Sequence, residues 1–143
     1  EQGLTLTAVE ARLVLARLEA RPGPLPDFPP TLVGMRNQYT YSPTERYEHI
    51  YLNDNFYAWQ CLDGVEKGLA DVDRCHYVQV AEDLYLFVWR EKIIPTLGVI
   101  LIDLQLMRTD GKIMGYQGSD FGALSNFPVG ASAKILNVTR HQE

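Results

Sequence analysis

The chain has 143 residues, of which 46% are hydrophobic and 22% are charged. These values are ordinary for a single soluble domain that is long enough to bury a sizeable core. A formal charge of −5 provides no basic surplus for neutralising phosphates, which argues against a nucleic-acid partner. Apolar runs such as Gly98–Asp103 are too short to span a bilayer, and lysines and arginines never adjoin one another. We therefore expect no membrane partner and a cytoplasmic location.

The first thirty residues are predicted to form a helix followed by an extended connector. Thr7 and Glu10 make a capping-box pattern, and Arg21-Pro22-Gly23 ends the helix. Residues 22–30 hold five of the eight prolines, which favours a connector because proline cannot donate to a strand ladder. We interpret the helix as a lid on one end of a barrel; the alternative is a dimer contact, which would make the chain a homodimer. The apolar stripe of the helix consists of Leu6, Val9, Leu13 and Ala16.

From residue 31 to 143 the sequence predicts a single β domain. Eight strands at hairpin spacing favour an antiparallel up-and-down barrel, whose closure removes exposed sheet edges. A barrel of this size can hold one small ligand. The predicted strands are Val33–Tyr41, Arg46–Asn53, Phe56–Leu62, Cys75–Val80, Leu84–Glu91, Gly98–Met107, Lys112–Tyr116 and Ala131–Val138.

Two kinds of connection are predicted between these strands. Short turns are expected at Asn53-Asp54-Asn55, Glu82-Asp83 and Asp110-Gly111. Three longer connections, at 64–74, 92–97 and 117–130, contain glycine or proline. Long connections in a compact domain often bind ligands, so these segments are candidate binding loops.

The predicted hairpin at 39–53 is unusually rich in phenol, imidazole and carboxylate side chains. Because strand side chains alternate, Glu45, Tyr47, His49 and Tyr51 share one face, provided that the register does not slip by one residue. A polar-lined cavity would explain this density; the alternative is half-buried tyrosines whose hydroxyls meet water. Candidate cavity residues are Tyr39, Tyr41, Tyr47, His49, Tyr51, Tyr57, Trp59 and Tyr85, with Arg74, His76, Trp89, Glu91 and Asp103 supplying a polar mouth or floor.

Cofactor-dependent chemistry has little support in the sequence. His49 and His76 lack a metal-ligand spacing, and no glycine-rich phosphate cradle or serine nucleophile elbow is present. Cys61 and Cys75 are expected to be buried free thiols, although a cross-strand disulfide is the alternative. We therefore expect neither a metal nor a cofactor, which leaves acid–base chemistry or plain binding of a small organic ligand.

Two long segments and one short segment resemble a known family. The segments Tyr57–His76, Leu84–Gly98 and Asn126–Gly130 are similar to the C-terminal domain of MoaF, and the likeness extends from about Leu32 to His141. This resemblance implies a calycin/lipocalin-like barrel. The family name also implies a role in molybdenum cofactor biosynthesis.

A second, shorter likeness is to the phenolic acid decarboxylases, which are also lipocalin-like. It is carried by Tyr39-Thr40-Tyr41, by the strand 47–51 and by the segment 82–89. The resemblance implies that Tyr39 and Tyr41 meet a substrate carboxylate and that Glu82 meets the phenol end. Where that family carries an arginine, this sequence has Gln60, which we place among the ligand-binding candidates.

These observations give two principal hypotheses for function. The first is a cofactor-independent lyase or isomerase, decarboxylase-like, that acts on a small aromatic or unsaturated acid. Tyr39 and Tyr41 would anchor the acid, and Glu82 and His49 would move protons. The second is a non-catalytic binding or carrier barrel in a biosynthetic pathway such as molybdenum cofactor assembly. A barrel filled by its own aromatic side chains, serving only as a structural appendix, is a third hypothesis.

Overall fold

A computed structural model describes residues 32–117 and 120–140. The predicted N-terminal helix and the proline-rich connector lie outside these described residues. Within the described ranges every regular element is a β-strand.

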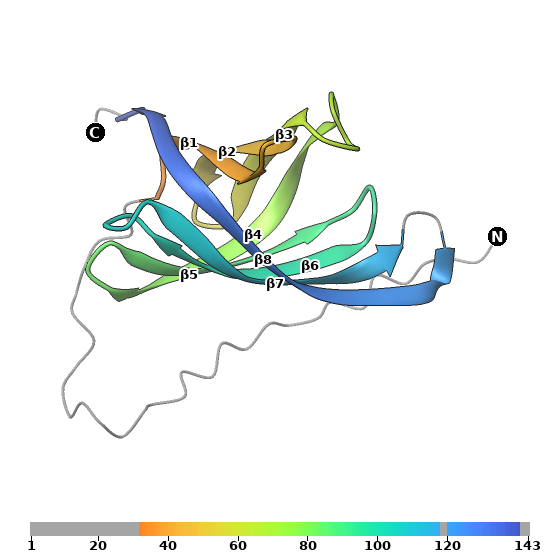
Figure 1. Ribbon diagram of the computed structural model, residues 1–143. Coiled ribbons are helices and arrows are strands. Elements are labelled where there is room, and N and C mark those ends of the chain that lie inside the picture. The colour runs from red at the N-terminus through yellow and green to blue at the C-terminus, as the bar shows by residue number, and fades with distance from the viewer. Residues whose placement is uncertain (1–31, 118–119, 141–143) are drawn as a thin grey trace, which may run out of the picture.

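The strands follow one another around a closed barrel in which each strand pairs antiparallel with the next and β8 returns to β1 (Figure 1). This arrangement confirms the predicted eight-stranded antiparallel up-and-down barrel. The strands are β1 (Met35–Ser42), β2 (Glu45–Asn53), β3 (Phe56–Asp63), β4 (Ala70–Ala81), β5 (Leu84–Glu91), β6 (Thr96–Asp103), β7 (Arg108–Gln117) and β8 (Asp120–Val138).

The core fills one end of the barrel with the inward face of each strand. In β3 and β5, buried and half-buried residues alternate along all but the last residue of each strand, as expected for strands with one face toward the core. Aromatic rings dominate, and His49 contacts several of them edge-on. The largest fully buried apolar side chains are Leu32, Tyr39, Tyr51, Tyr57, Tyr85, Phe87, Ile100 and Ile102.

Two predicted turns at this end are present at the predicted positions. Between β2 and β3, the Asn53 side-chain oxygen accepts hydrogen bonds from the backbone N–H groups of Asn55 and Phe56 at 2.9 and 3.0 Å. Between β4 and β5, Asp83 adopts φ 53°, a left-handed conformation that aspartate tolerates better than most residues.

The predicted turn at Asp110-Gly111 is wrong. Gly111 lies inside β7, opposite Ile100 of β6, where an added Cβ would come within 2.1 Å of the Val99 carbonyl oxygen. Glycine is therefore required there by close backbone approach rather than by a turn. The actual turn occupies residues 104–107 and ends at Met107, with φ 50°.

One of the three predicted long loops, 117–130, is largely strand, and another, 64–74, is partly strand. β4 begins at Ala70 and β8 begins at Asp120, so the segments 64–74 and 117–130 are only partly connections. β8 pairs with β7 from Asp120 to Ser132, but it pairs with β1 only from Ser132 onward. The first part of β8 therefore borders β7 alone among the described strands.

Cys61 and Cys75 are both buried and free, as expected. Cys61 lies near the end of β3, whereas Cys75 donates its backbone N–H to Asn55 at the opposite end of that strand. Among the described residues, no helix has the length and apolarity needed to cross a bilayer.

Candidate ligand-binding cavity

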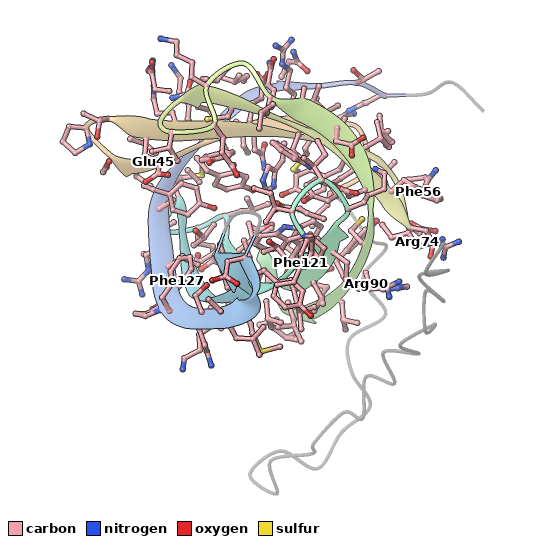
Figure 2. All side chains as sticks on the ribbon, turned by 90° about the vertical axis from the view of Figure 1, so that its right-hand side faces the viewer. Glu45, Phe56, Arg74, Arg90, Phe121 and Phe127 are labelled. Atoms are coloured by element: carbon pink, nitrogen blue, oxygen red, sulfur yellow. The ribbon has the colours of Figure 1, made fainter. Side chains whose placement is uncertain are left out.

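A cavity of about 280 Å³ occupies the barrel end opposite the aromatic core. Its walls come from strand ends next to the β1–β2, β3–β4, β5–β6 and β7–β8 connections. Figure 2 looks along the barrel into this end, with Glu45 and Phe127 on the same side of the opening. The lining residues are Tyr41, Glu45, Tyr47, His49, Trp59, Val65, Glu66, Trp89, Glu91, Ile94, Thr96, Ile113, Gly115, Tyr116, Ser125, Phe127 and Val129.

His49 is the deepest polar residue of this lining. Its ring centroid lies 4.8 Å from that of Tyr39 and 4.9 Å from that of Tyr57, and the residue is 4% exposed. Burial lowers the pKa of His49 to about 3, so the imidazole is neutral at ordinary pH. Its Nδ1 atom has no hydrogen-bond partner among the described residues.

In the closed core next to His49, two tyrosine hydroxyls are hydrogen-bonded to one another. The hydroxyls of Tyr39 and Tyr51 lie 2.8 Å apart, and the Asn37 side-chain amide donates to the Tyr39 hydroxyl at 3.3 Å. Burial raises the pKa of both phenols. Tyr39 is thus a neutral, fully enclosed core residue, and it is absent from the cavity lining.

Three carboxylates, Glu45, Glu66 and Glu91, line the cavity. Tyr47 donates its hydroxyl hydrogen to Glu66 Oε2 at 2.8 Å, which orients that side chain. Glu91 accepts the indole N–H of Trp89 at 2.6 Å. Burial raises the pKa of Glu91 to about 7, with Glu66 and Asp73 adding electrostatic repulsion.

Trp59 is held by a buried carboxylate behind the wall. Its indole N–H donates to Asp73 Oδ2 at 2.8 Å, and Asp73 is 2% exposed. Lys92 neutralises that carboxylate from outside, with its ammonium nitrogen 2.9 Å from Asp73 Oδ1 and 2.6 Å from Asp71 Oδ2. The indole N–H groups of both cavity tryptophans are therefore committed to carboxylates.

The structure brings together several residues that the sequence singled out. Six of them line the cavity, namely Tyr41, Tyr47, His49, Trp59, Trp89 and Glu91. Four others lie in the closed core beside it, namely Tyr39, Tyr51, Tyr57 and Tyr85. The face of β2 that carries Glu45, Tyr47 and His49 points inward.

The remaining candidates lie away from the cavity. Gln60 donates its side-chain amide to Glu48 on the opposite face of β3. Arg74 is on the outside of the barrel (Figure 2), over the Phe56 ring at 5.2 Å. His76 follows buried Cys75 and so faces the other way. Glu82 is exposed in the β4–β5 turn, at the end of the barrel opposite the cavity.

Several lining residues were not singled out by the sequence. Glu66 lies in the β3–β4 connection, and only the expectation of a binding loop at 64–74 pointed toward it. Tyr116 lies in β7, at the end of a predicted strand, whereas Ser125, Phe127 and Val129 lie in the part of β8 that was predicted as a connection. In the described part of the chain, no cluster of three or more histidine, cysteine or acidic side chains is arranged to hold a metal ion.

Comparison with known proteins identifies the family. The model of the MoaF C-terminal domain matches residues 27–139. The chain belongs to the MoaF C-terminal domain family. The MoaF protein of Klebsiella aerogenes is 90% identical over 140 residues, which cover 98% of this chain and 53% of that protein. The chain therefore spans about half the length of this MoaF relative.

The barrel also occurs in a solved structure. The crystal structure of a candidate beta-lactamase from Burkholderia vietnamiensis superposes with a TM-score of 0.63. The alignment covers 76% of this chain and 99% of that one at 16% identity. At this identity the likeness supports the MoaF barrel fold and carries nothing about activity.

Proposed function

We propose that this MoaF domain is a small-molecule-binding barrel that holds an organic ligand in the cavity beside His49. The observation that carries the proposal is a concave site of about 280 Å³ in which apolar, aromatic and a few polar side chains converge. Such a lining is typical of ligand sites, and the volume suits a molecule smaller than most drugs.

A non-catalytic binding role fits the geometry better than the expected decarboxylase-like reaction. That reaction needs Tyr39, Tyr41 and Glu82 around one substrate. Tyr41 lines the cavity, Tyr39 is enclosed in the core, and Glu82 lies at the other end of the barrel. Service in a biosynthetic pathway such as molybdenum cofactor assembly stays a prediction.

The test of binding is native mass spectrometry of the freshly purified chain, followed by titration with a chemically diverse library. The chain has two tryptophans, and both line the cavity, so intrinsic fluorescence reports occupancy directly. We expect a copurifying mass or a saturable fluorescence change. The proposal would be refuted if the purified chain carries no ligand and no compound of the library changes its fluorescence.

One observation favours a second candidate, a cofactor-free proton-transfer enzyme centred on Glu91. A buried carboxyl group whose pKa is raised to about 7 can both accept and donate a proton near neutral pH. Solvent-deuterium incorporation into a bound ligand would test this reaction. Deuterium exchange that disappears in Glu91→Gln would favour the proton-transfer enzyme. A bound ligand that takes up no deuterium would favour the non-catalytic carrier.

A further inference from the structure

The charge of the cavity is negative. Its lining contains three glutamates and, among the described residues, neither lysine nor arginine. His49 is neutral because burial holds its pKa at about 3. A cleft lined by charges of one sign concentrates ions of the opposite sign.

Cationic side chains near the cavity end of the barrel form ion pairs with carboxylates outside the cavity lining. Lys92 pairs with Asp71 and Asp73, and Arg46 pairs with Asp63. Neither of these cations lines the cavity, so the glutamates of the lining have no lysine or arginine partner there among the described residues. These glutamates would therefore attract a cationic ligand.

The walls are suited to the same kind of ligand. Aromatic ring faces attract cations through their quadrupole, and tryptophan does so most strongly. Because the N–H edges of Trp59 and Trp89 are bonded to Asp73 and Glu91, these indoles are fixed in place at the cavity wall. One face of Trp89 is stacked on Phe87, with the ring centroids 5.5 Å apart. Six rings line the cavity: Tyr41, Tyr47, Trp59, Trp89, Tyr116 and Phe127.

The lining also provides for an uncharged portion of the ligand. Val65, Ile94, Ile113 and Val129 are aliphatic members of the wall. At the floor, the buried His49 has an unpartnered Nδ1 among the described residues, and a neutral imidazole can accept a hydrogen bond. The site thus combines acidic groups, aromatic faces and an apolar surface.

We infer that the cavity takes a small organic cation, namely a protonated or quaternary amine on an apolar body. This inference rests on the proposed binding function and names the ligand class of that site. It replaces the expected carboxylic acid, because an added anion would be repelled by Glu45, Glu66 and Glu91 and would find no cationic partner in the described lining.

The test compares ligands that share one ring and differ in charge: benzylammonium, benzyltrimethylammonium, benzyl alcohol and benzoate. Binding to the 143-residue chain is followed by tryptophan fluorescence and calorimetry at pH 8 and low salt. We expect at least one cation to bind about tenfold or more tightly than benzyl alcohol, with benzoate weakest. Raising the salt concentration should weaken cation binding selectively.

Variants then locate the effect. Glu66→Gln and Glu91→Gln should each lower cation affinity by roughly tenfold and lower the affinity for benzyl alcohol much less. Asp110→Asn is the matched control, because Asp110 is exposed on β7 and outside the cavity lining. Circular dichroism checks that each variant is folded, and Glu45→Gln replaces either glutamine variant that is not.

The outcomes separate this inference from the proposed function. Benzyl alcohol or benzoate binding as tightly as the cations would overturn the cation inference and leave small-molecule binding in place. The cation inference also fails, and binding stands, if no member of the set binds but a neutral or anionic library compound does. A chain that binds no compound of any charge would overturn both.

Discussion

The indole nitrogen of Trp89 lies 2.6 Å from Oε1 of Glu91, two residues further along the same strand. Residues two apart on a strand share a face, so both side chains point into the barrel. The bond favours the ionised carboxylate, but burial outweighs it and raises the pKa of Glu91 to about 7. This glutamate therefore changes charge near neutral pH inside the proposed site.

Glu91 should make the fold less stable as pH rises. Its folded pKa is about 7 against an ordinary 4.5, so between these values the folded chain binds more protons than the unfolded chain. The resulting loss is on the order of 3 kcal/mol. Denaturant titrations at pH 4.5 and 8 should show Glu91→Gln gaining stability relative to the parent chain as pH rises.

The comparison must be made between variants because His49 acts in the opposite direction. Burial lowers its pKa from 6.5 to about 3, so the unfolded chain binds the extra proton and stability rises with pH across that window. His49→Gln should remove this rise. Equal pH slopes for Glu91→Gln and the parent chain would show that Glu91 titrates normally.

Gly98 makes room for Trp89, its partner across β5 and β6. A Cβ at position 98 would lie 2.2 Å from two indole carbons of Trp89, so the ring must move. We expect Gly98→Ala to destabilise the fold by about 1–3 kcal/mol and to shift the tryptophan fluorescence. The control is Gly122→Ala, whose Cβ would meet only Asp120 Oδ1, at 3.2 Å. An unshifted spectrum for Gly98→Ala would contradict the packing.

Alternation along the strands made the fold predictable from sequence. The run from Glu45 to Tyr51 places polar and aromatic side chains on one face, and the structure turns that face inward. Short turns could be predicted at Asn53, whose side chain accepts hydrogen bonds from backbone N–H groups across the turn, and at Asp83, whose φ of 53° suits aspartate. Strand alternation and turn residues are local features, so they can be recognised in the sequence without knowledge of the tertiary fold.

Glycine and proline gave wrong predictions of turns and loops at positions where the tertiary structure places them inside strands. Pro128 suggested a loop, yet it lies in β8 opposite Lys112. It is tolerated there because this part of β8 pairs with β7 alone among the described strands, and edge positions need no donor. Glu82 was assigned to the site by family resemblance, whereas its turn lies at the far end of the barrel. Which end of a barrel holds the cavity is not encoded in any local pattern.

Gln60 should matter for stability and not for the cavity. Its amide donates to Glu48, which is 2% exposed on the outer face and also pairs with Arg36 at 2.6 Å. Gln60→Ala should cost about 1–2 kcal/mol, because a buried carboxylate loses a donor. Denaturant melts followed by tryptophan fluorescence would measure this, with an unchanged native spectrum.

Gln38→Ala is the control for that change, since Gln38 lies opposite Glu48 on the same face of the sheet. We expect its effect to stay within about 0.5 kcal/mol. A Gln60→Ala chain of parental stability, or one with an altered native tryptophan spectrum, would contradict the outward placement of Gln60.

Lys92 and Lys67 offer a matched pair of exposed lysines that differ in what they neutralise. Lys92 reaches the buried Asp73, whereas Lys67 pairs with the half-buried Asp63 at 2.9 Å. Lys92→Ala leaves the buried Asp73 carboxylate bonded to the Trp59 N–H but without its cation. We expect a loss of roughly 2 kcal/mol, which is less than a fully buried pair would cost because Lys92 is 61% exposed.

Lys67→Ala should lose less than about 0.5 kcal/mol, as exposed pairs usually do. Because Asp73 holds Trp59, Lys92→Ala should also alter the tryptophan spectrum, whereas Lys67→Ala should not. Thermal and denaturant unfolding of both variants, followed by fluorescence, would measure the difference. Equal stability losses for the two lysines would mean that Asp73 does not depend on Lys92 for its neutralisation.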